Sequence, residues 1–300
     1  MKRSAIAAAL ILTAIASRGQ GWYGKAGLGY AIPQAGQTLD GSGTPFSGTS
    51  NNTTGNFDIK SASLTSGLSG FFGIGYMHTR HIGVEIDANL GLLQQKYSYT
   101  ISNIEINGVP SSATITQQAR LPVIISPSLV LQTDGSKYNI YTRFGLALPL
   151  KTNVEQHVIQ RNDPGTGATT VNDFTFTLKN NFSVGFTGAA GVQYRMNKYM
   201  SIWGEVSMLS LSPYIKKADL TAVTSNGVSY NPSMVSGQTH ITYTKSGTTD
   251  STGVVQPAYA QPFSNFSFNV GFAFQFPSKR DYADNRQNKP GSRPKSGSFK

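Results

Sequence analysis

The chain has 300 residues and a formal net charge of +11, but only 13% of its residues are charged, against roughly 25% in a typical soluble domain. Its 11% of aromatic residues argue against a disordered chain. After the N-terminal leader there is no apolar run of about 20 residues, so no transmembrane helix is predicted. The 32 glycines and the many aromatics favour an all-β protein with an unusually uncharged surface. The absence of cysteine excludes disulfides and thiolate metal sites, and no cofactor is predicted.

Residues 1–19 have the pattern of a secretory signal peptide. Lys2 and Arg3 form a positively charged start, residues 5–16 are apolar, and small residues before position 20 offer two alternative cleavage sites. The apolar run is too short for an uncleaved membrane anchor. We therefore expect an exported protein.

Eight segments alternate between apolar side chains and small or polar ones, which is the pattern of β-strands. In chain order, the predicted strands lie at 22–32, 64–76, 82–92, 119–131, 138–150, 176–196, 200–208 and 266–276. The last one is the clearest, and its apolar parity consists of Phe266, Phe268, Val270, Phe272, Phe274 and Phe276. The segment at 200–208 fits worst, because Trp203 falls on the polar parity.

The connections between these segments alternate in length. Those at 77–81, 132–137 and 197–198 are short, whereas the polar stretches at 33–63, 93–118, 151–175 and 209–265 are long. This alternation predicts an eight-stranded antiparallel up-and-down meander, with both termini on the side of the short turns. An eight-stranded sheet with one apolar face is able to close into a barrel, which removes its exposed edges.

The barrel's apolar face could point inward, as in soluble lipocalin-like barrels, or outward, as in membrane barrels. The polar parity carries too few charges for a water-facing exterior, and it suits a packed interior. Tyr and Trp residues also gather near strand ends, as in the aromatic girdles of membrane barrels: Trp22, Tyr30, Tyr76, Tyr138, Tyr194 and Tyr199. The sequence thus predicts a transmembrane β-barrel over residues 20–277, with four long extracellular loops and short periplasmic turns.

This pattern resembles the small outer-membrane barrels of the OmpA/OmpX-like family, over roughly residues 20–277 and without an invariant motif. The resemblance implies a location in the outer membrane of a Gram-negative bacterium. It also implies that the strand ending at Phe276 is the insertion signal read by the outer-membrane barrel assembly machinery. In that family the signal usually ends the chain or precedes a folded domain. Here residues 278–300 follow it, and we expect them to form a basic, disordered periplasmic tail.

Charged residues on the polar parity predict a network inside the barrel. Counted from the periplasmic turns, Asp87, Arg143 and Glu205 fall at similar depth on the third, fifth and seventh strands. An unpaired charge in a low-dielectric interior costs several kcal/mol, so we expect these groups to pair. The proposed network comprises Lys25, Glu85, Asp87, Arg120, Arg143, Lys179, Arg195 and Glu205. It would plug the barrel, and the alternative is a gated ion path along the same charges.

Histidines are the natural candidates for a catalytic or metal site. His78 and His81 lie in a predicted periplasmic turn, whereas His157 and His240 lie in different extracellular loops. Outer-membrane enzymes that modify lipids need a base held rigidly by its neighbours, which flexible polar loops do not provide. We therefore predict neither an enzyme nor a metal site.

The expected function is a structural or interaction role, in which loops or tail bind a partner and the lumen is plugged. A narrow channel for ions or small solutes is the alternative, and a lipid-modifying enzyme at the rim is the third hypothesis. The predicted partners are outer-membrane lipid, the assembly machinery, and other envelope proteins or peptidoglycan through the basic tail. No nucleic acid is expected, because the body of the chain lacks a basic stripe. Much of the excess positive charge lies instead in residues 278–300, which hold seven basic and two acidic residues.

Overall fold

The computed structural model describes residues 21–34, 38–42, 57–106, 109–165, 167–234, 239–246 and 254–276. Over these ranges the chain is built of β-strands, with a 3-10 helix η1 (Pro232–Met234). None of the helical structure within these ranges is long and apolar enough to cross a membrane. The predicted signal peptide (1–19) and the predicted basic tail (278–300) lie outside the described residues.

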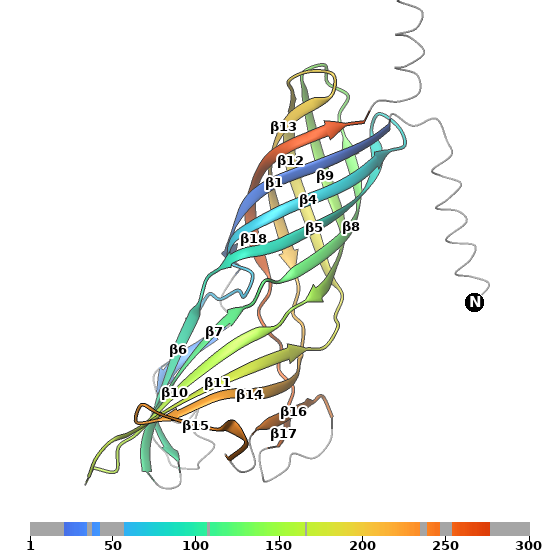
Figure 1. The fold of residues 1–300 in the computed structure, drawn as a ribbon. Helices are drawn as coiled ribbons and strands as arrows, with labels where there is room; N and C mark the ends of the chain where they lie inside the picture. Colours follow the sequence, from blue (N-terminus) through green and yellow to red (C-terminus); the bar gives the residue numbers. More distant parts are fainter. Residues whose placement is uncertain are drawn as a thin grey trace, which may run out of the picture.

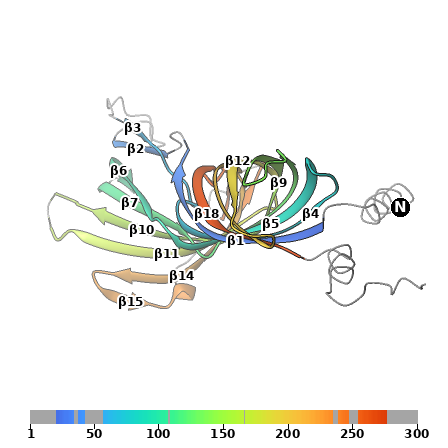
Figure 2. The same cartoon turned by 90° about the horizontal axis from the view of Figure 1, so that it is seen from above.

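Eight strands form a closed antiparallel barrel, as Figures 1 and 2 show. Each strand pairs with the one before and after it in this series, and the last pairs back with the first, so the predicted up-and-down meander is confirmed. The barrel strands are β1 (Gly21–Pro33), β4 (Gly67–Met77), β5 (Ile82–Gln94), β8 (Val123–Gln132), β9 (Tyr138–Lys151), β12 (Gly185–Arg195), β13 (Met200–Ser210) and β18 (Asn265–Gln275).

Two of the predicted strands extended too far. The segment at 176–196 is two strands, β11 (Thr170–Asn180) and β12, and only β12 belongs to the barrel. Likewise the segment at 119–131 begins at the end of β7 (Val109–Ala119), and the barrel strand β8 starts later. Leu121 between them has a positive φ of 47°, and Pro122 has no N–H to donate to a ladder. Alternation alone does not reveal such a break.

The exterior of the barrel is apolar. Leu28, Phe72, Phe268 and Val270 are each more than half exposed, although a soluble monomer would bury side chains of this size. In a bilayer these residues face lipid, and the closed ring of strands leaves no backbone edge unpaired. Short turns and a lipid-facing apolar belt are the form that outer-membrane barrels take, and the protein is accordingly an outer-membrane barrel.

Aromatic rings mark the end of the barrel where the short turns lie. Trp22 and Tyr76 have ring centroids 5.2 Å apart, and those of Tyr138 and Tyr194 are 5.1 Å apart. Rings of this kind gather at the membrane–water interface, because one end is apolar and the other polar. Outer-membrane barrels place their short turns in the periplasm and their long connections outside the cell, so we expect the same orientation here and name the two ends accordingly.

The long connections continue the barrel strands into a second sheet, visible below the barrel in Figure 1 and to one side of it in Figure 2. Its strand order is β17-β16-β14-β11-β10-β7-β6-β2-β3, and β15 pairs with β14. The sequence analysis expected loops here. Besides β7 and β11, the strands are β2 (Thr38–Ser42), β3 (Phe57–Lys60), β6 (Tyr97–Ile106), β10 (Val154–Asn162), β14 (Ile215–Ser225), β15 (Val228–Tyr230), β16 (His240–Thr244) and β17 (Val255–Pro257).

This extracellular sheet has an apolar core of its own, and the core reaches into the barrel mouth. Its members are Leu64, Ala119, Ile124, Ala147, Val154, Phe176, Leu178, Leu211, Ile215, Ala218, Leu220, Ile241 and Phe263. Ile124 and Ala147 belong to barrel strands and share the lumenal parity, whereas Leu64 and Phe263 come from the segments that precede β4 and β18. The Leu64 N–H donates to the Pro262 carbonyl at 2.7 Å, which ties these two segments together. The core therefore spans the extracellular sheet and the adjoining end of the barrel.

Candidate functional site

Four aromatic side chains lie on the lumenal parity, and each has a glycine as its cross-strand partner. The pairs are Tyr23 with Gly75, Phe71 with Gly27, Tyr141 with Gly191, and Trp203 with Gly271. A glycine has no side chain, so the ring across the strand is able to lie over it. A Cβ at Gly191 would stand 2.7 Å from Cζ of Tyr141, and one at Gly75 would overlap the Tyr23 ring. These glycines give the rings their space inside the barrel.

Five charged residues meet between these rings, and each is only 2% to 8% exposed. Arg143 is at the centre: its Nη2 donates to Oε1 of Glu205 at 2.7 Å, and its Nη1 pairs with the carboxylate of Asp87. Nζ of Lys25 lies 3.4 Å from Oε2 of Glu85, and Nε of Arg143 lies 4.0 Å from Oε1 of the same carboxylate. The network thus joins three carboxylates to two cations in one buried layer.

Neutral groups add hydrogen bonds to two of the three carboxylates. The Tyr23 hydroxyl donates to Glu85 at 2.7 Å, and the Tyr141 hydroxyl donates to Glu205 at 2.8 Å. The Asn269 amide donates to Oε1 of Glu205 at 3.2 Å. Buried charges are tolerated when pairing and hydrogen bonds replace their lost hydration, and these contacts supply both.

The aromatic rings also contact the two cations. Nζ of Lys25 lies 4.6 Å from the ring centroid of Tyr141 and 4.9 Å from that of Trp203, within the range of cation–π attraction. Cζ of Arg143 lies 4.9 Å from the ring centroid of Phe71, which in turn packs edge-on against Trp203 at 5.3 Å. Rings and charges therefore form one continuous packed layer across the lumen.

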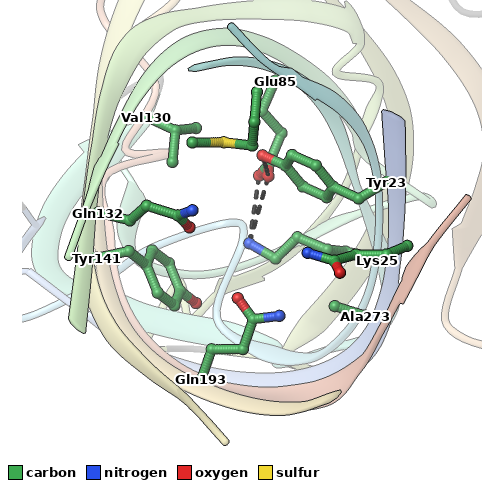
Figure 3. Close-up of a pocket in the computed structure, with 10 residues that line it drawn as sticks. Tyr23, Lys25, Glu85, Val130, Gln132, Tyr141, Gln193 and Ala273 are labelled. Atoms are coloured by element: carbon green, nitrogen blue, oxygen red, sulfur yellow. Dashed lines mark hydrogen bonds and ion pairs between the residues drawn. The ribbon is translucent and has the colours of Figure 1, made fainter. Parts of the chain in front are cut away.

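Little space remains on either side of this layer. Figure 3 shows the periplasmic-side cavity, into which Tyr23, Lys25, Glu85 and Tyr141 point. About 20 Å³ there is open to water, and about 30 Å³ in the cavity on the extracellular side, next to Arg143. Those volumes hold roughly one or two water molecules each. The two cavities are separated by the charged and aromatic layer.

The structure brings together five of the eight residues proposed for the lumenal network: Lys25, Glu85, Asp87, Arg143 and Glu205. The prediction was wrong for Arg120, Lys179 and Arg195. Lys179 lies on β11 of the extracellular sheet and Arg120 directly follows β7, so both precede the barrel strands β12 and β8. Arg195 lies at the periplasmic end of β12, where it donates to the Ser136 carbonyl at 3.5 Å.

The outer face of the extracellular sheet carries two polar clusters around single carboxylates. Nε and Nη2 of Arg120 donate to Glu155 at 2.9 and 2.6 Å, and Nε2 of His157 lies 3.1 Å from the same carboxylate. Burial by itself would raise the pKa of Glu155, but the hydrogen bonds from Arg120 and His157 outweigh it and lower that pKa below its usual range.

The second cluster surrounds Asp219. Its carboxylate lies 3.1 Å from Nζ of Lys217, 3.6 Å from Nζ of Lys179 and 3.0 Å from Nδ1 of His240. Burial opposes ionisation here too, but the hydrogen bonds from His240 and Lys217 lower the pKa of Asp219. Within the described ranges, no three His, Cys, Asp or Glu side chains are grouped so as to hold a metal ion.

The sequence analysis missed the uncharged members of the lumenal layer. Tyr23, Phe71 and Tyr141 share the parity of the charges, and their size among small neighbours was a usable signal. Trp203 was noticed, but only as a departure from alternation. Its place in the lumen, 1% exposed, shows that it fills the interior instead.

Comparison with known proteins finds no matching family model and no matching curated protein. Two similar solved structures are the outer membrane protein OprG from Pseudomonas aeruginosa, with 10% identity and a TM-score of 0.41, and Outer Membrane Protein W from E. coli, with 17% identity and a TM-score of 0.34. Each alignment covers 87% of this chain and 99% of the solved one. The narrower OmpA/OmpX-like assignment stays a prediction.

Proposed function

We propose that the protein is a closed outer-membrane barrel that does not conduct, and that its extracellular sheet binds a partner outside the cell. One observation supports the first part above all: the lumen is filled at two successive levels. The buried layer around Arg143 fills the middle of the barrel, and the apolar core around Leu64 and Phe263 fills its extracellular mouth. An ion would have to displace both.

The test is conductance in planar bilayers, with heat-modifiability on gels used first to show that each variant is folded. We expect the parent protein to give no current steps above background. A Phe71→Gly/Trp203→Gly variant, which removes two rings from the lumenal layer, is the control for detecting an opened lumen. Steps from the parent protein, with an ion selectivity that changes in Glu205→Gln, would instead support a narrow channel for ions or small solutes.

The edge of the extracellular sheet supports the second part of the proposal. β15 pairs with β14, and its Val228 and Tyr230 are more than half exposed. An exposed strand edge is able to accept an extended segment of another protein by strand addition. A photo-crosslinking residue at Tyr230 should capture such a segment, and Ser229→Pro, which removes an N–H on the free edge of β15, should abolish the product. Equal capture from a probe at Thr177, on the outer face, would contradict binding at this edge.

We also propose that the protein is not an enzyme. The sequence argument for this was that flexible loops cannot hold a catalytic base, and the structure calls for a different reason. His157 is held on paired strands, with Glu155 at Nε2 and Thr175 Oγ1 3.2 Å from Nδ1. Its side chain lies on an open sheet face and is 43% exposed, so a substrate there would keep its water. Mass spectrometry of membrane lipids should give identical profiles for the parent, His157→Ala and His240→Ala. A lipid product lost in either variant would establish catalysis.

The last barrel strand is proposed to serve as the insertion signal. Phe276 directly follows β18, and the other five lie on its outward parity: Phe266, Phe268, Val270, Phe272 and Phe274. All six are exposed, where a receptor for the unfolded strand could read them. Phe274→Ser/Phe276→Ser should slow the appearance of heat-modifiable protein in the outer membrane. Ser267→Ala, on the lumenal parity of the same strand, should not. Normal insertion of the double variant would contradict the proposal.

A further inference from the structure

At five of the eight points where the chain passes between the barrel and the extracellular sheet, cations and exposed apolar side chains lie next to each other. The apolar residues at these five junctions are exposed: Leu93, Leu121, Leu150, Phe182 and Tyr214. The cations beside them, called here the boundary cations, are Lys96, Arg120, Lys151, Lys179, Lys216, Lys217 and Lys245. Lys245 belongs to this set because its Nζ lies 4.1 Å from the Tyr214 ring centroid.

Six of the boundary cations lie in a junction or within three residues of one along the chain, and Lys245 contacts Tyr214 in the junction before β14. β5 and β9 end, and β8 and β12 begin, at the extracellular end of the barrel, so the junctions that flank them mark the outer limit of the apolar belt (Figure 1). Membrane proteins place amphipathic side chains at this limit, with apolar parts among acyl chains and charges among head groups. The level of the boundary cations is therefore the level of the lipid head groups.

Among the described residues, the boundary cations outnumber the carboxylates that pair with them. Glu155 pairs with Arg120, and Asp219 is shared by Lys179 and Lys217, which makes two carboxylates for seven cations. Lys179 and Lys217 are also direct cross-strand partners on β11 and β14. Like charges in that position repel each other, and the single charge of Asp219 offsets only part of the repulsion. A further anion between them would relieve it.

We propose that the boundary cations bind the phosphate groups of an outer-leaflet lipid, a phosphorylated and multiply acylated glycolipid, whose acyl chains pack on the exposed apolar residues beside them. A soluble polyanion would contact the cations but would leave Leu93 and Phe182 in water. Only an amphiphile satisfies both halves of each junction. Lysine and arginine are the usual side chains that hold phosphate.

The test is a titration of the full-length protein in neutral detergent micelles, with bound lipid counted by native mass spectrometry. The probes are bisphosphorylated lipid A and the same lipid with both phosphates removed. We expect the phosphorylated form to bind more tightly, with an affinity that falls as salt is added. Lys179→Gln/Lys217→Gln should weaken its binding about 25-fold, at about fivefold for each cation.

Two controls separate this proposal from the alternatives. Lys137→Gln/Lys198→Gln, at the periplasmic end, should bind the phosphorylated lipid as the parent does. Leu93→Ser/Phe182→Ser should weaken both lipid forms alike, because it removes contacts with acyl chains. The proposal would be overturned if the parent bound both lipids equally well, or if Lys137→Gln/Lys198→Gln lost as much affinity as Lys179→Gln/Lys217→Gln. It would also be overturned if inorganic phosphate bound as tightly as the phosphorylated lipid. Heat-modifiability confirms that every variant is folded.

Discussion

The barrel and the extracellular sheet share one chain and one alternating pattern, but they use it in opposite directions. In the barrel the apolar parity faces lipid, and the polar parity holds a buried layer of charges around Arg143. In the extracellular sheet the apolar parity faces a core around Leu178, and charges such as Glu155 lie on the outer face. What surrounds a strand therefore decides which of its faces is the inside, and a mutation has opposite consequences in the two regions.

The largest effect is expected from a charge removed inside the barrel. Arg143→Gln leaves three carboxylates with Lys25 as their remaining cation, and breaking a buried pair of this kind costs about 3–5 kcal/mol. Urea unfolding in detergent micelles, followed by the heat-modifiable band, measures the loss. The control is Arg80→Gln, since the Arg80–Asp134 pair at 3.1 Å is exposed and contributes about 0–1 kcal/mol. Equal costs for both variants would remove the distinction between lumen and surface.

A leucine removed from the core of the extracellular sheet is expected to act next most strongly. Leu178→Ala should destabilise that sheet by about 2–5 kcal/mol, because Leu178 is fully buried. Limited proteolysis should cut the sheet faster while the barrel stays resistant. Leu146→Ala removes the same atoms from the lipid face, and its effect on proteolysis should be slight. If the two leucine variants were cut alike, the opposite orientation of the two regions would be wrong.

A methyl group added inside the barrel is expected to have an intermediate effect. In Gly191→Ala the new Cβ would lie 2.6 Å from the Gly204 carbonyl oxygen and 2.7 Å from Cζ of Tyr141. The strand and the ring must both shift, which should cost about 1–3 kcal/mol in the same urea assay. Gly188→Ala lies in the same strand, but its new Cβ would be 3.9 Å from the nearest neighbouring atom, the Arg143 carbonyl oxygen. It should unfold as the parent does. A similar loss for both would mean that glycine matters for strand formation and not for the ring.

The smallest effect concerns pH and is confined to the extracellular sheet. Because the folded pKa values of Glu155 and Asp219 are lowered, their contribution to stability is complete above the unfolded values of about 4 and is lost as pH falls through the folded ones. Proteolysis of the sheet should therefore differ between the parent and Glu155→Gln/Asp219→Asn at pH 7. The difference should shrink as the pH falls and vanish once both carboxyls are protonated in the folded protein. A difference that persisted in acid would assign the effect to packing.

The two regions also differ in how far the sequence predicted them. Alternation and the lengths of the connections were sufficient for the barrel, because period two is a local property and short turns fix the pairing of strands within each hairpin. The same count placed Asp87, Arg143 and Glu205 at one depth, and they share one network. The long connections were expected to be loops, because their strands have weak patterns and form only by pairing with one another.

The sequence by itself determined that the chain is an eight-stranded barrel with an apolar exterior, since every strand carries that information in its own residues. Only the tertiary structure decided where each strand leaves the barrel, and so placed Arg120 and Lys179 outside the lumen. It also decided that Tyr141 faces Gly191 and that Trp203 faces Gly271. These contacts depend on the register between strands, including strands joined by long connections, and no local pattern specifies that register. The closure of the barrel does.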